Sequence, residues 1–163
     1  MIILLDSKKE EAEAKQKKDR FLSLFVLVSF LVLTGLTLGI IYSPEDYLLL
    51  EIVMILLLTI YLWLTIYFFS SPYRALKKRY LFFLESKEGI KEEEEVEVLG
   101  LEKDQTLTKD GLTAYLLKGQ IKEKDKVYPR DIYLLTEEDN LLPGMKIKAV
   151  TFNNVLFAYE AGR

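Results

Sequence analysis

Two long uncharged stretches constrain this chain more than any other feature of its sequence. Residues 21–42 carry no charged side chain, and residues 47–71 carry only Glu51. As a helix, the first stretch would be about 33 Å long, enough to cross the hydrocarbon core of a bilayer. A soluble fold would have to bury both stretches, and the rest of the chain is too short to do so. We therefore predict a membrane protein with a transmembrane helical hairpin over residues 21–71.

The first stretch does not fit a cleaved signal peptide. Its apolar run is longer than the apolar region of a signal, no Ala-x-Ala-like cleavage site follows, and a second apolar stretch comes directly after it.

The charges that flank the hairpin predict its orientation. Six Lys and Arg residues lie within residues 8–20, and four more follow the second stretch at Arg74, Lys77, Lys78 and Arg79. The connection at residues 43–46 has two acidic residues and no basic one. Because basic residues stay on the cytoplasmic side, we expect a multi-pass protein of the inner (plasma) membrane with both termini in the cytoplasm.

The hairpin has a candidate packing site at its outer end. Gly35 and Gly39 form a small-xxx-small pattern, which lets helix backbones approach closely. Equal counting from the turn places Glu51 and Met54 opposite these glycines, on a face that also contains Tyr61. We predict that Glu51 and Met54 lie over the Gly35–Gly39 notch. The alternatives are that the glycines face lipid or mediate contact between copies of the chain.

Two further segments flank the hairpin. Residues 1–20 are a mixed-charge run that favours a solvated N-terminal helix, with docking of residues 2–5 onto the following domain or a partner as the alternative. Residues 72–91 begin at Pro72, which marks a break after the second span, and predict a basic amphipathic helix on the inner leaflet. Its Arg74, Lys77, Lys78 and Arg79 would contact anionic lipid. Ordinary charge anchoring explains the same residues.

Residues 92–163 change to short apolar runs separated by turns, which is typical of strands. Asp110-Gly111, the segment 124–126 and Asn153-Asn154 are expected turns. Pro129 assigns the first half of its strand to an edge or bulge. The acidic run Glu92–Glu95 fits a solvated linker. Five or six strands without a long helix predict a small all-β barrel that is closed or nearly closed.

The order of these parts resembles the NfeD-like membrane proteins, whose C-terminal domain is an OB-type barrel. The resemblance rests on Gly100, Thr106-Leu107 and Gly111, and on a closing hairpin over residues 142–156 that contains Leu142-Pro143-Gly144 and Asn153-Asn154. It implies a non-catalytic module that associates with membrane scaffolds of the stomatin and flotillin type. The protease domain that some relatives carry has no counterpart here.

The composition excludes most enzyme chemistry. The chain has no Cys and no His, so it lacks a thiolate nucleophile, an imidazole base and the usual zinc ligands. No phosphate-binding glycine loop or Ser-x-x-Lys motif is present. We expect no catalysis, no cofactor and no metal. Residues 92–163 hold 10 Lys and Arg against 15 Asp and Glu, a net charge of −5, so nucleic acid is not an expected partner.

Two functions fit these features. The first is a membrane anchor that presents the small barrel to a protein partner, with membrane lipid and another membrane protein or a second copy as contacts. The second is a ligand-responsive effector whose barrel controls oligomerisation or opening of the hairpins. We favour the anchor, because a barrel this small has little room for a ligand.

Overall fold

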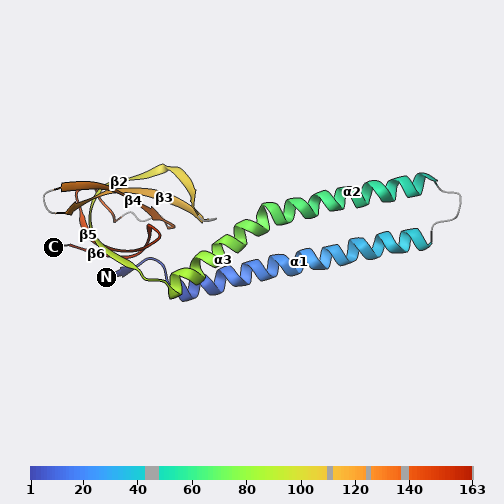
Figure 1. The fold of residues 1–163 in the computed structure, drawn as a ribbon, viewed down its shortest axis with the longest axis horizontal. Coiled ribbons are helices and arrows are strands. Elements are labelled where there is room, and N and C mark those ends of the chain that lie inside the picture. The colour runs from blue at the N-terminus through green and yellow to red at the C-terminus, as the bar shows by residue number, and fades with distance from the viewer. Residues whose placement is uncertain (43–47, 110–111, 124–125, 137–139, 163) are drawn as a thin grey trace. The chain divides into compact units, whose positions relative to one another are not determined.

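A computed structural model describes residues 1–162 except 43–47, 110–111, 124–125 and 137–139. The elements, in chain order, are β1 (Ile2–Ile3), α1 (Ser7–Ile41), α2 (Leu48–Ser70), α3 (Pro72–Glu88), β2 (Glu92–Lys109), β3 (Leu112–Glu123), β4 (Lys126–Leu134), β5 (Lys146–Phe152) and β6 (Val155–Ala161) (Figure 1). The chain forms two compact units. One contains Lys15–Lys77, and the other contains Met1–Ala14 with Lys78–Arg163.

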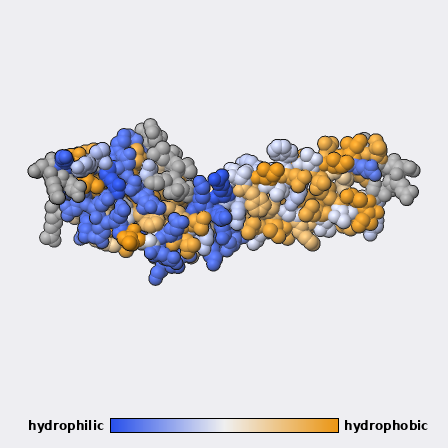
Figure 2. Space-filling model, viewed as in Figure 1, coloured by the Kyte–Doolittle hydropathy of each residue, from blue (hydrophilic) through white to orange (hydrophobic). Residues whose placement is uncertain are grey.

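The two long apolar helices that the sequence predicts are present. The most apolar windows of α1 and of the α2–α3 segment have 0% and 6% of their residues buried. A core helix of a soluble protein would bury most of such a window. Figure 2 shows the hydrophobic side chains gathered over these helices. Both helices are therefore long and apolar enough to cross a membrane, and their apolar surface has no protein cover within the described chain.

The break expected at Pro72 is only one residue long. Ser71 alone separates α2 from α3, its amide donates to Tyr67 O, and the Ala75 amide donates to Ser71 O. Pro72 occupies the first position of α3, where a missing N–H costs no helical hydrogen bond. The two helices follow each other almost without interruption for that reason.

The six strands belong to one sheet whose pairings return to their starting point. The order is β1-β6-β4-β3-β2-β5, and β5 also pairs with β6. The long strand β2 pairs with β5 through Glu92–Glu97 and with β3 through Glu97–Lys109. β4 runs antiparallel to β3 and meets β6 in parallel at Tyr133 and Val155. The six-stranded sheet agrees with the predicted number of strands.

Two details of the sheet confirm the sequence analysis. Asn153 and Asn154 have φ angles of 50° and 64°, as a two-residue hairpin turn requires. β4, which contains Pro129, pairs along β3 but meets β6 only at Tyr133, so its first half lies at an edge. The turns expected at Asp110-Gly111 and at 124–125 lie outside the described residues.

The acidic run Glu92–Glu95 is not a linker; that expectation was wrong. These residues begin β2 and pair with Thr151 through Lys148 of β5. Arg130 binds Glu94 through two hydrogen bonds, Nε to Oε2 at 2.9 Å and Nη2 to Oε1 at 2.8 Å. Glu93 pairs with Lys148 at 2.7 Å. Cations from two other strands therefore neutralise carboxylates that look mutually repulsive in the sequence.

The core of the sheet is formed by side chains from all five long strands. The largest fully buried ones are Tyr159, Leu117, Ile132, Leu134, Ile147, Leu156, Val96 and Val98. Gly119 allows β2 and β3 to approach closely here. A Cβ at Gly119 would overlap with Val96 Cγ1 and lie 3.3 Å from Glu97 O. Val96 is itself buried, so it has little freedom to move away.

Gly119→Ala should therefore destabilise the β domain by about 1–3 kcal/mol, because the added methyl overpacks the core. Urea unfolding of the full chain in detergent, followed by far-UV circular dichroism, measures this. Gly100→Ala is the matched control, since a Cβ at Gly100 meets nothing within 4 Å. Equal stability of the two variants would contradict the packing described here.

Candidate functional site

Within the helical unit, α2 presents one face to α1. The less exposed positions described on α2 are Met54, Tyr61, Thr65 and Phe68, at steps of seven, four and three residues, which keep them on one face of the helix. Phe68 stacks on Phe25, with ring centroids 3.9 Å apart and planes 18° apart. This is the face that the sequence analysis assigned to helix packing, and aromatic stacking provides its largest contacts.

The two glycines of α1 differ in their surroundings. A Cβ added at Gly39 would lie 2.5 Å from Met54 Cε and 3.4 Å from Met54 Sδ, so Gly39 and Met54 are in contact. A Cβ added at Gly35 would meet nothing within 4 Å. Glu51 is exposed. The close approach of the helices is therefore seen at Gly39, and the prediction that Met54 also lies over Gly35 was wrong, because nothing comes within 4 Å of a Cβ there. The role of Glu51 stays a prediction.

Sequence reasoning missed one polar group of this contact. The Ser29 hydroxyl is buried and has no hydrogen-bond partner. Thr65, on the opposing helix, donates its hydroxyl to Tyr61 O at 2.9 Å. An unsatisfied hydroxyl in an apolar environment costs free energy, so the inner face of the hairpin is less uniformly apolar than its sequence suggests.

The Gly39–Met54 contact predicts a specific crosslink. A chain with Gly39→Cys and Met54→Cys should form an intramolecular disulfide in membranes under mild oxidation, because the two positions are adjacent. The natural chain has no cysteine, so the background is clean. Gly35→Cys with Met54→Cys is the control and should react much less. A gel mobility shift measures both, and the reverse order would contradict this geometry.

In the other unit, the N-terminus docks onto the sheet. Ile2 and Ile3 form β1 and pair with Tyr159 and Ala158 of β6. The amides of Leu4 and Leu5 donate to Phe157 O at 2.9 and 3.0 Å. The favoured expectation of a solvated N-terminal segment was therefore wrong for residues 2–5. Leu4 and Leu5 pack against the core clusters and gain free energy by leaving water, whereas Ile2 and Ile3 are held by backbone pairing and stay exposed.

A second apolar cluster joins this N-terminal segment to α3. It contains Leu5, Ala14, Phe82, Phe83, Leu112, Val155 and Phe157, all buried, with Phe83 fully so. The sequence predicted that this helix lies on the inner leaflet, with its apolar face toward the membrane, and for Phe83 this was wrong, because Phe83 is fully buried. The apolar side chains Phe82 and Phe83 pack instead inside the β-domain unit, because contact with the sheet and the start of α1 removes them from water.

Ion pairs surround the cluster. Arg79 Nη2 lies 3.4 Å from Glu10 Oε2, and Lys87 Nζ lies 2.9 Å from Glu11 Oε2. The hydrogen bond to the Glu11 carboxylate raises the pKa of Lys87. Lys91 donates to Ser7 Oγ at 3.0 Å. The start of α1 is thus held to α3, and to Lys91 just beyond it, by both apolar and charged contacts.

The four basic residues predicted to contact lipid do not share one environment. Arg74, Lys77 and Lys78 are exposed. Arg79 is half-buried, pairs with Glu10 and lies over the Phe83 ring at 5.8 Å. The guanidinium of Arg79 therefore helps to hold α1 against α3. The prediction that Arg79 contacts lipid was wrong.

The junction predicts a localised loss of stability. Leu5→Ala should destabilise the β domain by about 2–5 kcal/mol, because it leaves a cavity between β1, α3 and the sheet. Leu142→Ala is the control, since Leu142 is 64% exposed. Thermal unfolding monitored by circular dichroism compares the two variants. If both melt together with the wild type, the docked N-terminus contributes nothing to the fold.

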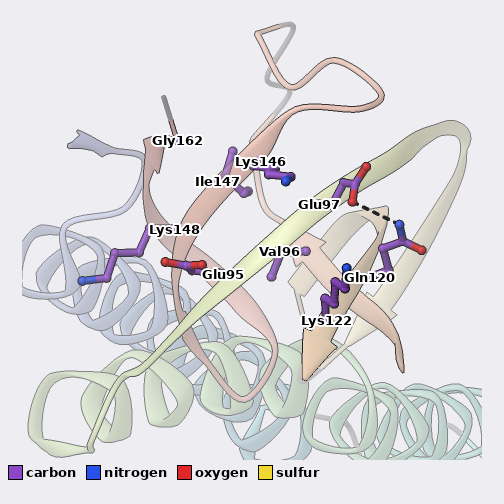
Figure 3. Close-up of a pocket in the computed structure, with 9 residues that line it drawn as sticks. All are labelled: Glu95, Val96, Glu97, Gln120, Lys122, Lys146, Ile147, Lys148 and Gly162. Carbon is purple, nitrogen blue, oxygen red and sulfur yellow. Dashed lines mark hydrogen bonds between the residues drawn. The ribbon is translucent and has the colours of Figure 1, made fainter. Parts of the chain in front are cut away.

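A pocket of about 490 Å³ opens where β2 parts from β3 (Figure 3). Its lining is polar and of mixed charge, with Glu95, Glu97, Lys122, Lys146 and Lys148 among its residues. Gln120 donates to Glu97 at 3.2 Å across it. The hydrogen bond to the Glu93 carboxylate raises the pKa of Lys148.

The described residues hold no group of three acidic or other metal-ligating side chains that could bind a metal ion.

Comparisons with known proteins identify no relative of this chain. No protein-family model, no curated protein and no solved structure matches the chain.

Proposed function

We propose that this protein is a non-catalytic membrane anchor that presents its β domain to a protein partner. The observation that carries this proposal is the junction of the β domain. It fixes the first turns of α1 and the second half of α3 to one sheet, through Leu5, Phe82 and Phe83. These are the segments that lead into and out of the two apolar helices. The β domain therefore includes both chain segments that flank the apolar helices, as expected for a domain that a helical hairpin holds at a membrane.

The strand pairings support an OB-type barrel for this domain. The ladder runs from β2 through β3, β4, β6 and β5 and back to β2, which is the pattern of a five-stranded closed sheet. The resemblance to NfeD-like proteins, drawn from the turn residues, implies the same fold. It also implies a partner among membrane scaffold proteins, and the partner we propose is of that kind.

The charges on the two flanks support the orientation. We place both termini and the β domain in the cytoplasm, next to the inner membrane, with α1 and α2 crossing it as a two-span hairpin. Arg74, Lys77 and Lys78 are exposed on α3 and can meet anionic headgroups. The net charge of residues 92–163 favours a protein over a nucleic acid as the partner.

Side-specific labelling tests this arrangement. Ile90→Cys places a thiol at a side chain that is 90% exposed in the β-domain unit, and Tyr42→Cys places one at a side chain that is 79% exposed at the end of α1. In intact cells, an impermeant maleimide should label the Tyr42 position and leave the Ile90 position unreacted until the membrane is permeabilised.

Labelling of the Ile90 position in intact cells would contradict a cytoplasmic β domain. Release of the protein from membranes by carbonate or urea would contradict the anchor itself, because a spanning helix is not extracted by either treatment.

A further inference from the structure

Strand β1 leaves one edge of the sheet open within the described chain. β5 pairs with β6 from Phe152–Val155 to Ile147–Ala161 and so occupies one edge of β6 along its length. β1 must therefore lie on the other edge, beyond the point where β4 meets it. The Leu4 amide donates to Phe157 O, toward β6. Because backbone groups alternate along a strand, the N–H and C=O of Ile3 point away from β6.

An apolar pocket with a basic rim reaches from β1 across β6 to β5. Its volume is about 530 Å³, and its apolar lining includes Ile3, Ala158 and Val150, which neighbour one another across these three strands. Three lysines also line it, Lys8, Lys87 and Lys91. Lys87 is paired with Glu11, so with Asp6 the three positive charges face two negative ones and the rim keeps a net charge of +1. Ile3 is 65% exposed although it is part of a strand. An exposed, apolar strand edge invites pairing with another chain.

We propose that this edge and pocket bind an extended, acidic segment of a protein partner by strand addition. The backbone of the segment would pair with Ile3, an apolar side chain would enter the pocket, and carboxylates would meet the lysines. This inference rests on the proposed anchor function and names the chemistry of its partner.

The charge of the rim decides between possible occupants. A second copy of this chain would bring the same three lysines to the contact, and like charges would oppose it. A lipid would satisfy the lysines but offers no backbone to pair with Ile3. An acidic peptide satisfies both features.

The probe is a fluorescein-labelled peptide, Glu-Glu-Val-Ile-Val-Glu-Glu, added to the full chain in phosphatidylcholine nanodiscs. Fluorescence polarisation should show saturable binding that weakens with salt. A peptide with Gln in place of each Glu should bind more weakly, and so should one with alternate backbone amides methylated. Equal binding of all three peptides, or no binding of the first, would overturn the proposal.

Two variants test the site itself. Ile3→Pro removes the outward N–H while leaving the Leu4 amide free to hold β6, and should weaken binding about tenfold. Lys8→Gln removes one rim charge and should weaken binding about two- to fivefold. Lys9→Gln is its matched control, because Lys9 lies next to Lys8 in the same turn of α1 but does not line the pocket. Lys8→Gln is expected to fold even if Ile3→Pro does not.

The remaining outcomes are decisive as well. If Lys8→Gln and Lys9→Gln bind the peptide equally, the pocket is not the site. If Lys8→Gln leaves peptide binding intact but lowers binding to phosphatidylglycerol vesicles, the pocket takes lipid and strand addition is wrong. Peptide binding by a chain that carbonate or urea releases from membranes would overturn the anchor function alone, and the reverse result would overturn only this inference.

Discussion

The contact between the N-terminus, helix α3 and the sheet is the interaction on which the rest of the β-domain unit depends. Leu5, Phe82, Phe83 and Phe157 come from three distant parts of the chain and are buried together. Apolar burial is the main favourable term in folding, so this cluster holds the start of α1 and the second half of α3 against the sheet. The pairs Glu10–Arg79 and Glu11–Lys87 then fix how α1 is oriented against α3, because ion pairs are directional and apolar contacts are not.

The same contact brings together the two chain segments that flank the apolar helices, since residues 1–14 and the chain from Lys78 onward belong to one compact unit. Strand β1 in this unit is only two residues long, and within the described residues no strand pairs with its other edge. We propose this edge as the place where a partner strand is added.

Ion pairs in the β domain are local, and the net charge of its residues does not show where they form. Glu92–Glu95 looks like a solvated run, yet Arg130 from β4 and Lys148 from β5 pair with three of its four carboxylates. Alternation along β2 sends these carboxylates to opposite faces, where different cations meet them. The basic residues near the start of α3 divide in a similar way, because the helix directs the adjacent side chains of Lys78 and Arg79 to different sides, Lys78 to solvent and Arg79 to Glu10.

The sequence alone determined the two apolar helices, the strand-rich C-terminal domain, the Asn153-Asn154 turn and the edge position of Pro129. Each of these follows from local chemistry: the length of an apolar run, the φ angles that Asn tolerates, or a missing N–H. Only the tertiary structure decided that residues 2–5 join the sheet, that Phe83 faces inward, and that Gly39 rather than Gly35 meets Met54. These outcomes depend on which surfaces compete for the same side chain, and that competition involves residues far apart in the chain.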